Sequence, residues 1–349
     1  MSDERRSVLL TTLTRREATP GLVTKLAEIG IAGIRLIAKG YRPEEYRENY
    51  DELLAAGRDV VDGFRILVDL PGGKPRISSH VHDLKVERGM RLLLHGERDQ
   101  PSEGEPPRVP TVGLMPFVTN IEPGHRIMVA DGSIEMSVVA RQENGILVEV
   151  MSDTDEVTAS RSINLPDSHA RYSSRGNDDG VLLAFERDTP LEVAVSMVAD
   201  RDDVDRVRTL LPEASVTAKL ETQTGLDHLA EITEAADELL IARGDLSIEM
   251  PLRLLCSTCE LIQRSAHGAG TRFILAAGFL DAVARTGHPS IAEVSDLWHH
   301  HRAGVRTFML SGTVCVTNPV DVTRWAKMLL DDFDRADARL DDRTRIDAS

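Results

Sequence analysis

The sequence predicts an α/β fold in which eight parallel strands, each followed by a helix, close into a (β/α)8 barrel of the TIM type. Three observations predict it. Apolar runs of strand length recur eight times along the 349 residues. Several of these runs are almost entirely apolar instead of alternating, as in parallel strands that are covered on both faces. Stretches of helical periodicity lie between them, and eight such units in a row favour a closed ring over an open, doubly wound sheet.

The predicted strands and helices follow one another in a regular order. Proline lies at or beside the first residue of several helices, where its fixed backbone angle and missing amide hydrogen are tolerated. Helices are predicted at Gly21–Ile29, from Pro43 to near Gly57, and at Leu252–Ala266, Ile291–Arg302 and Val320–Leu330. The eight predicted strands are Val8–Leu13, Gly33–Ala38, Arg65–Leu70, Glu192–Val198, Val216–Glu221, Glu238–Ala242, Arg272–Ala276 and Arg306–Leu310.

One segment, from about Ser78 to Asp167, lacks this alternation of strand and helix. It carries short runs with alternating polarity, separated by turn signals such as Pro123-Gly124 and Asp131-Gly132. This pattern predicts a small β-barrel domain inserted after the third strand. We therefore expect a first barrel segment at 1–77, the inserted domain at 78–167, a second barrel segment at 168–330 and a charged, disordered tail at 331–349.

The composition excludes several classes of protein. Hydrophobic residues make up 41% and charged residues 28%, as in a soluble globular protein. The net charge of -16 argues against binding to nucleic acid backbones, and we find no apolar run of the ~20 residues that would span a membrane. Three cysteines and an N-terminus without a secretory pattern predict a cytoplasmic protein.

The carboxyl ends of the strands are where barrel enzymes place their reacting groups. Lys219 and Glu221 are two residues apart on one predicted strand, so their side chains project to the same side. Asp245 follows the end of the next strand, about 4.8 Å away at the backbone. Two carboxylates at that separation repel unless a cation lies between them, and their oxygens suit Mg²⁺ or Mn²⁺. The alternative is a buried ion cluster that only holds the barrel closed.

Lysine is rare in this chain, and most of its basic residues are arginines. Of its six lysines, Lys39, Lys74 and Lys219 lie at the ends of the second, third and fifth predicted strands. This placement suggests compact positive charges at one rim, although chance placement stays an alternative. Backbone amides at Gly244-Asp245 and at Ser311-Gly312 are positioned to hold an anion.

Several blocks of sequence also carry a family resemblance. In the barrel they are Ile34-Arg35-Leu36, Asp69-Leu70-Pro71-Gly72-Gly73-Lys74-Pro75-Arg76, Ala218-Lys219-Leu220-Glu221, Ile241-Ala242-Arg243-Gly244-Asp245-Leu246, Ala292-Glu293-Val294-Ser295-Asp296 and Met309-Leu310-Ser311-Gly312. In the insert they are Pro123-Gly124-His125-Arg126-Ile127, Asp131-Gly132-Ser133-Ile134-Glu135 and Ile163-Asn164-Leu165-Pro166. Over roughly residues 7 to 330 and in this order, the chain resembles the pyruvate kinase family.

The resemblance implies roles for these residues. Lys219 would stabilise the transferring phosphoryl group or the enolate oxygen, and Glu221 and Asp245 would hold Mg²⁺ or Mn²⁺. The implied catalytic residues are Lys219, Arg35 and Ser311. The implied substrate-binding residues are Gly244, Asp245, Arg243 and Ser196. The implied nucleotide or phosphate contacts are Arg35, Arg76 and Arg161.

The sequence also departs from the family. Ile37, Ala38, Lys39 and Gly40 stand where the family has Asn, Phe, Ser and His, so a monovalent cation would lose ligands. By resemblance, Lys74, together with Asp69, would replace that ion, and potassium would not be required. Ala277 stands where the family has a threonine that assists protonation. We also expect the family's C-terminal domain to be lacking.

The resemblance therefore implies a cytoplasmic enzyme that transfers phosphoryl between phosphoenolpyruvate and ADP through a magnesium-bound pyruvate enolate. Two alternatives remain open: a nucleotide-independent lyase of an oxaloacetate-like acid, and a binding relative with little turnover.

Trp298 and Trp325 suggest a homo-oligomer. We expect Asp178-Asp179-Gly180 to form a surface turn and His299-His300-His301 to lie on a solvated helix face. We expect Cys256 and Cys259 to serve helix packing.

Overall fold

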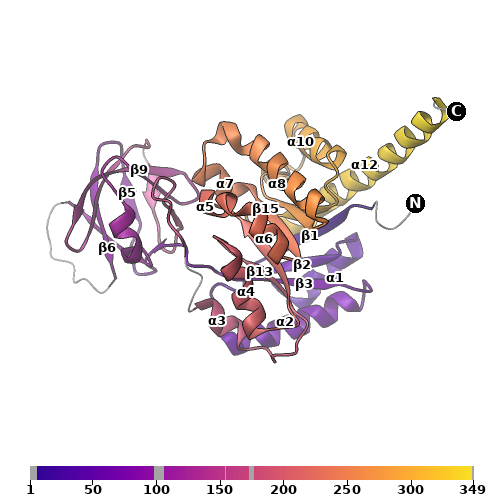
Figure 1. Cartoon of the computed structure of the whole chain (residues 1–349), viewed down its shortest axis with the longest axis horizontal. Helices are drawn as coiled ribbons and strands as arrows, with labels where there is room; N and C mark the ends of the chain where they lie inside the picture. Colours follow the sequence, from indigo (N-terminus) through magenta and orange to yellow (C-terminus); the bar gives the residue numbers. More distant parts are fainter. Residues whose placement is uncertain (1–5, 98–105, 154, 173–176, 348–349) are drawn as a thin grey trace.

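The computed structural model describes residues 6–97, 106–153, 155–172 and 177–347. Eight parallel strands close into a barrel in the order β1-β17-β16-β15-β14-β13-β3-β2, which confirms the predicted TIM-type fold (Figure 1). The barrel strands are β1 (Val8–Leu13), β2 (Gly33–Ile37), β3 (Arg65–Asp69), β13 (Glu192–Val195), β14 (Ser215–Leu220), β15 (Glu238–Ala242), β16 (Arg272–Ala276) and β17 (Thr307–Leu310).

Helices surround the ring of strands. They are α1 (Pro20–Ile29), α2 (Pro43–Arg58), α3 (Asn177–Leu182), α4 (Arg201–Leu210), α5 (Gln223–Asp227), α6 (Leu229–Ala235), α7 (Arg243–Glu249), α8 (Leu255–Ala269), α9 (Asp281–Thr286), α10 (Ile291–Arg302), α11 (Gly312–Thr317) and α12 (Pro319–Asp347). Thr19 caps α1 ahead of Pro20, and Ser290 and Glu293 form a capping box on α10. Among the described helices, none is both long and apolar enough to cross a membrane.

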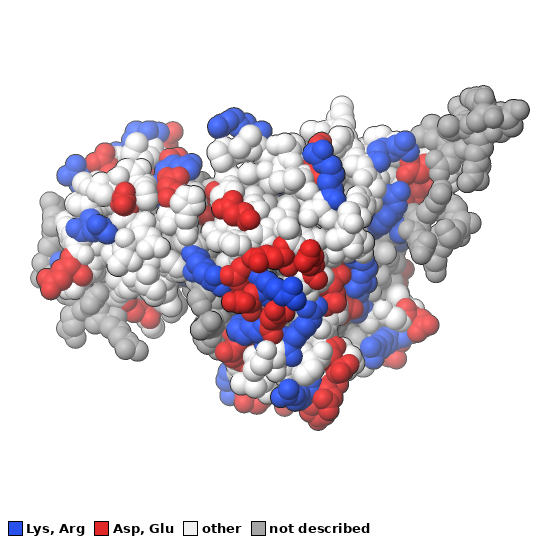
Figure 2. Space-filling view, viewed as in Figure 1, with Lys and Arg blue, Asp and Glu red and all other residues white. Residues whose placement is uncertain are grey.

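The surface carries charges of both signs. Figure 2 shows acidic and basic side chains interleaved over α4 and α6. Arg201 pairs with Asp205 within α4, and Arg208 of α4 reaches Asp237 just after α6. Such exposed pairs contribute at most about 1 kcal/mol each, but they keep this face from presenting a single sign of charge.

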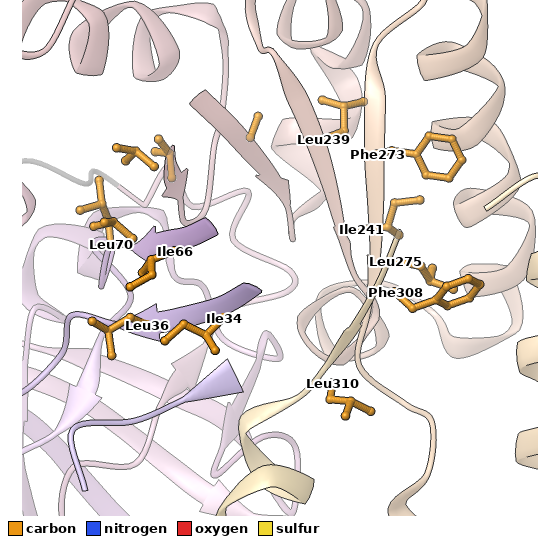
Figure 3. Packing of buried hydrophobic residues seen from close by; sticks show 14 of the residues in the cluster. Ile34, Leu36, Ile66, Leu70, Leu239, Ile241, Phe273, Leu275, Phe308 and Leu310 are labelled. Atoms are coloured by element: carbon orange, nitrogen blue, oxygen red, sulfur yellow. The ribbon is translucent and has the colours of Figure 1, made fainter. Parts of the chain in front are cut away.

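The barrel contains two apolar layers because its strand residues alternate between the inside and the outside of the ring. Inside, a compact cluster includes Leu10, Leu67, Leu240, Ile274 and Met309. Outside, side chains such as those labelled in Figure 3 belong to a larger cluster that the helices cover; they are Ile34, Leu36, Ile66, Leu70, Leu239, Ile241, Phe273, Leu275, Phe308 and Leu310. Burial on both faces explains why these strands read as nearly continuous apolar runs.

The chain between β3 and β13 forms a second sheet, which lies to one side of the barrel, away from both termini (Figure 1). Its seven strands run in the order β12-β8-β9-β10-β6-β7-β4. A bridge between Arg76 and Ser162 joins the two ends, so the sheet is nearly closed. The strands are β4 (Arg76–Ile77), β6 (Arg91–Gly96), β7 (Arg108–Val112), β8 (Arg126–Val129), β9 (Ile134–Gln142), β10 (Gly145–Val150) and β12 (Ile163–Asn164). A separate pair is β5 (Leu84–Val86) with β11 (Asp155–Val157).

The C-terminal segment differs from its prediction. Instead of a disordered tail from residue 331, α12 continues to Asp347, while residues 348–349 lie outside the described part. Phe333 packs edge-on against Trp298, with ring centroids 5.0 Å apart. The carboxylate of Asp334 lies 2.8 Å from Nε2 of the fully buried His301 and accepts hydrogen bonds from Ser7. The helix therefore continues because it has partners that are distant in sequence.

These contacts also correct two side-chain expectations. His300 and His301 are buried, so the three histidines do not form a solvated face. Trp298 stacks on His301, and the indole nitrogen of Trp325 donates to the carbonyl of Gly287 at 3.0 Å. Both tryptophans thus pack within the chain, and they carry no argument for an oligomer.

Candidate functional site

A cleft of about 570 Å³ opens at the carboxyl ends of the barrel strands, where the inserted sheet meets the barrel. This is the face on which barrel enzymes build their active sites. Its walls combine strand ends of the barrel with residues 131 and 160–162 of the insert. The predicted site residues that line it are Arg35, Lys74, Arg76, Arg161, Ser196, Lys219, Glu221, Gly244, Asp245 and Ser311.

Lys219 lies at the centre of this cleft and is almost completely buried. Its ammonium nitrogen is 3.1 Å from Asp69 Oδ1 and 3.1 Å from Glu221 Oε1, and it donates to Ser196 Oγ at 2.7 Å. Burial would lower the pKa of Lys219, but the charges of Asp69 and Glu221 outweigh it and raise the pKa. The structure therefore holds a permanent positive charge at a fixed point.

Two carboxylates face this part of the cleft. Glu221 is buried and its Oε2 accepts the backbone N–H of Met197 at 2.6 Å. Burial raises the pKa of Glu221, and although Lys219 acts against it, the charge of Asp245 adds to the rise. Burial would also raise the pKa of Asp245, but its ion pair with Lys74 lowers it. The two acids are close enough to influence each other, with one more easily protonated than the other.

The carboxylates fit a magnesium ion only together with a substrate. Among the described residues no group of three or more His, Cys, Asp or Glu could hold a metal ion by itself. Mg²⁺ in phosphoryl-transfer sites commonly uses one or two carboxylates and completes its shell with substrate oxygens and water. A divalent cation at this point would also relieve the repulsion between Glu221 and Asp245. Glu221 and Asp245 thus match a magnesium site that is completed by substrate oxygens. Lys74 donates a hydrogen bond to Asp245.

Lys74 and Asp69, the two residues expected to replace a monovalent cation, have different ion-pair partners. Its ammonium bonds Asp245, whereas Asp69 is neutralised by Lys219 and by Arg35, whose Nε lies 3.8 Å from Asp69 Oδ2. The loop that carries Lys74 turns at Gly72, which has a φ of 68°, in the left-handed region that favours glycine.

Two residues predicted to contact the substrate, Ser196 and Arg243, also have partners within the chain. The hydroxyl of Ser196 lines the cleft, but it donates to the carbonyl of Leu70 at 2.8 Å while accepting from Lys219. Arg243 lies beneath the cleft, where Nη1 is 2.8 Å from Asp296 Oδ2 and Nε donates to the carbonyl of Ala277 at 2.9 Å. Ser196 thus orients Lys219, and Arg243 supports the end of β16.

Sequence reasoning missed the residues that fasten the insert to the barrel. Glu249, at the end of α7, is buried and accepts from Asn164 Nδ2 at 2.6 Å and from Tyr172 Oη at 2.9 Å. Asn164 also bonds Asp245 and helps to lower its pKa. Asn164 lies in one of the blocks quoted above and Glu249 comes shortly after another, but nothing local in the sequence shows that they meet.

Asp178 is a further buried carboxylate, and the expectation of a surface turn at this position is wrong. Its side chain is fully buried in α3, and Oδ1 accepts the backbone N–H of Gly72 at 3.1 Å. Burial raises the pKa of Asp178 to about 6. Since Gly72 belongs to the loop that carries Lys74, Asp178 anchors that loop from outside the cleft. The one available signal was its place just before the apolar pair Val181 and Leu182.

The sequence of the chain is similar to those of known proteins. Residues 4–320 match the family model described as pyruvate kinase, barrel domain. The chain is 29% identical over 317 residues to the pyruvate kinase of Methylorubrum extorquens, covering 89% of this chain and 65% of that protein. It is 25% identical over 338 residues to the pyruvate kinase of Chlamydia muridarum, covering 95% and 69%. The chain thus spans about two thirds of the length of these relatives.

Proposed function

Because the chain belongs to the pyruvate kinase family, we propose that it transfers a phosphoryl group between phosphoenolpyruvate and ADP through the enolate of pyruvate. The observation that carries this proposal is the convergence of Lys219, Glu221 and Asp245 in one cleft. Phosphoryl transfer depends mainly on positioning and on neutralising charge, and this cleft offers fixed charges for both.

The residues of the chain have separable tasks in this proposal. Magnesium, when bound with Glu221 and Asp245, would supply positive charge to the phosphoryl and enolate oxygens. Lys219 is held by three partners, so its ammonium stabilises developing negative charge without reorganising. The backbone amides that follow Ala242, at the first turn of α7, are suited to hold the carboxylate of pyruvate.

The protonation step would differ from that of most relatives. Ala277 lines the cleft at the end of β16 and offers a methyl group but no hydroxyl. This observation favours a second candidate, in which the same charges stabilise an enolate produced from an oxaloacetate-like acid without nucleotide. The two candidates share Lys219 and both acids, and they differ in whether ADP is consumed.

A coupled assay tests the proposal. Purified protein is given phosphoenolpyruvate, ADP and Mg²⁺, and pyruvate formation is followed with and without ADP. Lys219→Met should lower kcat by roughly 10²- to 10³-fold, the cost of losing one preorganised charge at a reacting centre. Lys25→Met, an exposed lysine on α1, is the matched control and should leave the rate unchanged. Pyruvate formation from oxaloacetate alone, with no ADP-dependent rate, would instead select the lyase.

A further inference from the structure

Met197, just beyond the end of β13, belongs to two parts of the molecule at once. Its neighbours Val195 and Val198 are buried in the larger cluster that the helices of the barrel cover. The side chain of Met197 is 3% exposed and belongs instead to the apolar cluster of the insert. In the part of the chain that the structure describes, every other buried member of that cluster lies between residues 77 and 172. Met197 is thus the point at which a barrel loop enters the core of the insert.

The backbone of the same residue contacts an acid of the barrel. The Met197 N–H donates to Oε2 of Glu221 at 2.6 Å, and both residues are buried. The other oxygen of this carboxylate, Oε1, lies 3.1 Å from the ammonium nitrogen of Lys219. Among the described residues, each oxygen of Glu221 therefore has one partner. These two partners fix the orientation of the carboxylate and leave lone pairs on both oxygens for a further ligand.

Met197 presents this N–H through an uncommon backbone conformation. Its φ is 56°, in the left-handed region that residues with a side chain rarely adopt. Such a conformation persists only where surrounding contacts maintain it. For Met197 those contacts are the packing of its side chain in the insert and the hydrogen bond to Glu221. Without the packing, the backbone would relax to a commoner angle and turn the N–H away from the carboxylate.

The orientation of Glu221 matters because a divalent cation would need it together with Asp245. Both acids line the cleft, and Mg²⁺ demands near-ideal geometry from the few carboxylates that it uses. If Glu221 lost the N–H of Met197, its carboxylate could turn fully toward Lys219, its remaining partner. An oxygen that turns toward the ammonium is withdrawn from the cation. The packing of Met197 in the insert therefore bears on cation binding in the barrel.

We propose that Met197 is a positioning residue for the divalent cation: anchored in the core of the insert, it holds Glu221 in the orientation that the cation requires. The insert is then part of the cation site, although both carboxylates belong to the barrel. The assignment of Glu221 to a cation rests on the proposed function. The dependence of Glu221 on Met197 does not, and it can be measured without turnover.

The direct test is binding of Mn²⁺, a spectroscopic substitute for Mg²⁺, in the presence of phosphoenolpyruvate or of oxaloacetate. Loss of the free-ion EPR signal is measured against the same solution without protein. Met197→Ala should weaken binding about tenfold, as expected when a ligating carboxylate loses one charge-assisted hydrogen bond. Met197→Leu conserves the volume of the side chain and should bind like the wild type. Met136→Ala is the matched control, because it removes the same side chain from the same buried cluster and should leave the affinity for Mn²⁺ unchanged.

A glycine variant separates positioning from packing. Glycine adopts a φ of 56° without strain, so nothing drives the backbone of Met197→Gly away from Glu221. Met197→Gly should therefore lose less affinity for Mn²⁺ than Met197→Ala, although it removes more of the side chain. A role in packing alone predicts the reverse order. Hydrogen exchange of the amide at position 197, measured by NMR without any ligand, should be slow in the wild type and in Met136→Ala and fast in Met197→Ala.

Three outcomes would overturn the inference: equal affinity of Met197→Ala and wild type for Mn²⁺, an equal loss in Met136→Ala, or no binding of Mn²⁺ by the wild type with either acid. Failure of the proposed function has a different signature. Binding of Mn²⁺ that depends on Met197, without turnover of ADP, keeps the positioning role and rejects the kinase. Turnover of ADP with an unchanged requirement for Mg²⁺ in Met197→Ala does the reverse.

Discussion

Replacing Asp178 by asparagine should make the protein more stable at neutral pH. Asp178 is fully buried, and its burial raises the pKa from 3.8 to about 6. At about 1.36 kcal/mol for each factor of ten, this rise corresponds to about 3 kcal/mol. Asparagine cannot ionise, yet its oxygen can still accept the Gly72 N–H. Asp178→Asn should therefore gain up to about 3 kcal/mol, a figure that already includes the opposing effect of Arg206 on the pKa of Asp178.

The sign of the effect follows from the raised pKa. Above pH 6 the folded protein carries a buried carboxylate that the unfolded chain would solvate, so the penalty is complete there. Below the unfolded value of about 4 both states are protonated, and the penalty disappears. Urea unfolding at pH 7.5 and at pH 4.5 should therefore show a gain for Asp178→Asn that shrinks to about 1 kcal/mol at the lower pH.

The neighbouring residue provides the control. Asp179 pairs with Arg206 as well, but it is only partly buried. Asp179→Asn should show no comparable gain at pH 7.5. The reasoning is refuted if Asp178→Asn is less stable than the wild type at pH 7.5, or if its gain is the same at both values of pH.

Three further predictions concern other parts of the chain. Millimolar Mg²⁺ added together with phosphoenolpyruvate should raise Tm further than phosphoenolpyruvate alone, and Glu221→Gln should abolish this extra rise because it removes one of two carboxylates available to the ion; an extra rise that persists would place the metal elsewhere. His301→Ala should lower the free energy of unfolding by roughly 3 kcal/mol, measured in urea, because it breaks a buried pair and leaves Asp334 with only its hydrogen bonds from Ser7. Ala277→Gly should raise stability by about 1 kcal/mol in the same measurement, since Ala277 has a φ of 66°; a loss would contradict strain at this position.

The sequence predicted the barrel well because its signal is local. Each barrel strand is buried on both faces, so its apolar run is visible without knowing its neighbours; Leu239 to Ala242 of β15 is an example. Rim residues such as Lys219 and Glu221 could be placed on one side because side chains alternate along a strand. The family resemblance confirmed by the comparison then rested on short blocks at these same strand ends.

The features that could not be predicted all depend on contacts that are distant in sequence. Lys74 meets Asp245 across 171 residues, and Asp178 meets Gly72 across 106 residues. Whether a polar segment such as the end of α12 is ordered depends on partners such as His301, and no periodicity reveals them. The sequence alone therefore led to the prediction of a tail at the charged end of the chain and of a solvated face at the buried histidines.

The hydrogen bond between Ser7 and Asp334 joins two residues that are 327 positions apart in the sequence. The first strand also needs β17 to complete its pairing in the ring. During synthesis, β1 can therefore complete its pairing only after residues 307–310 have emerged. We expect the nascent protein to depend on chaperones over that interval. We also expect that loss of the Ser7–Asp334 hydrogen bonds would reduce the yield of folded protein in cells more than it reduces the activity of the folded protein.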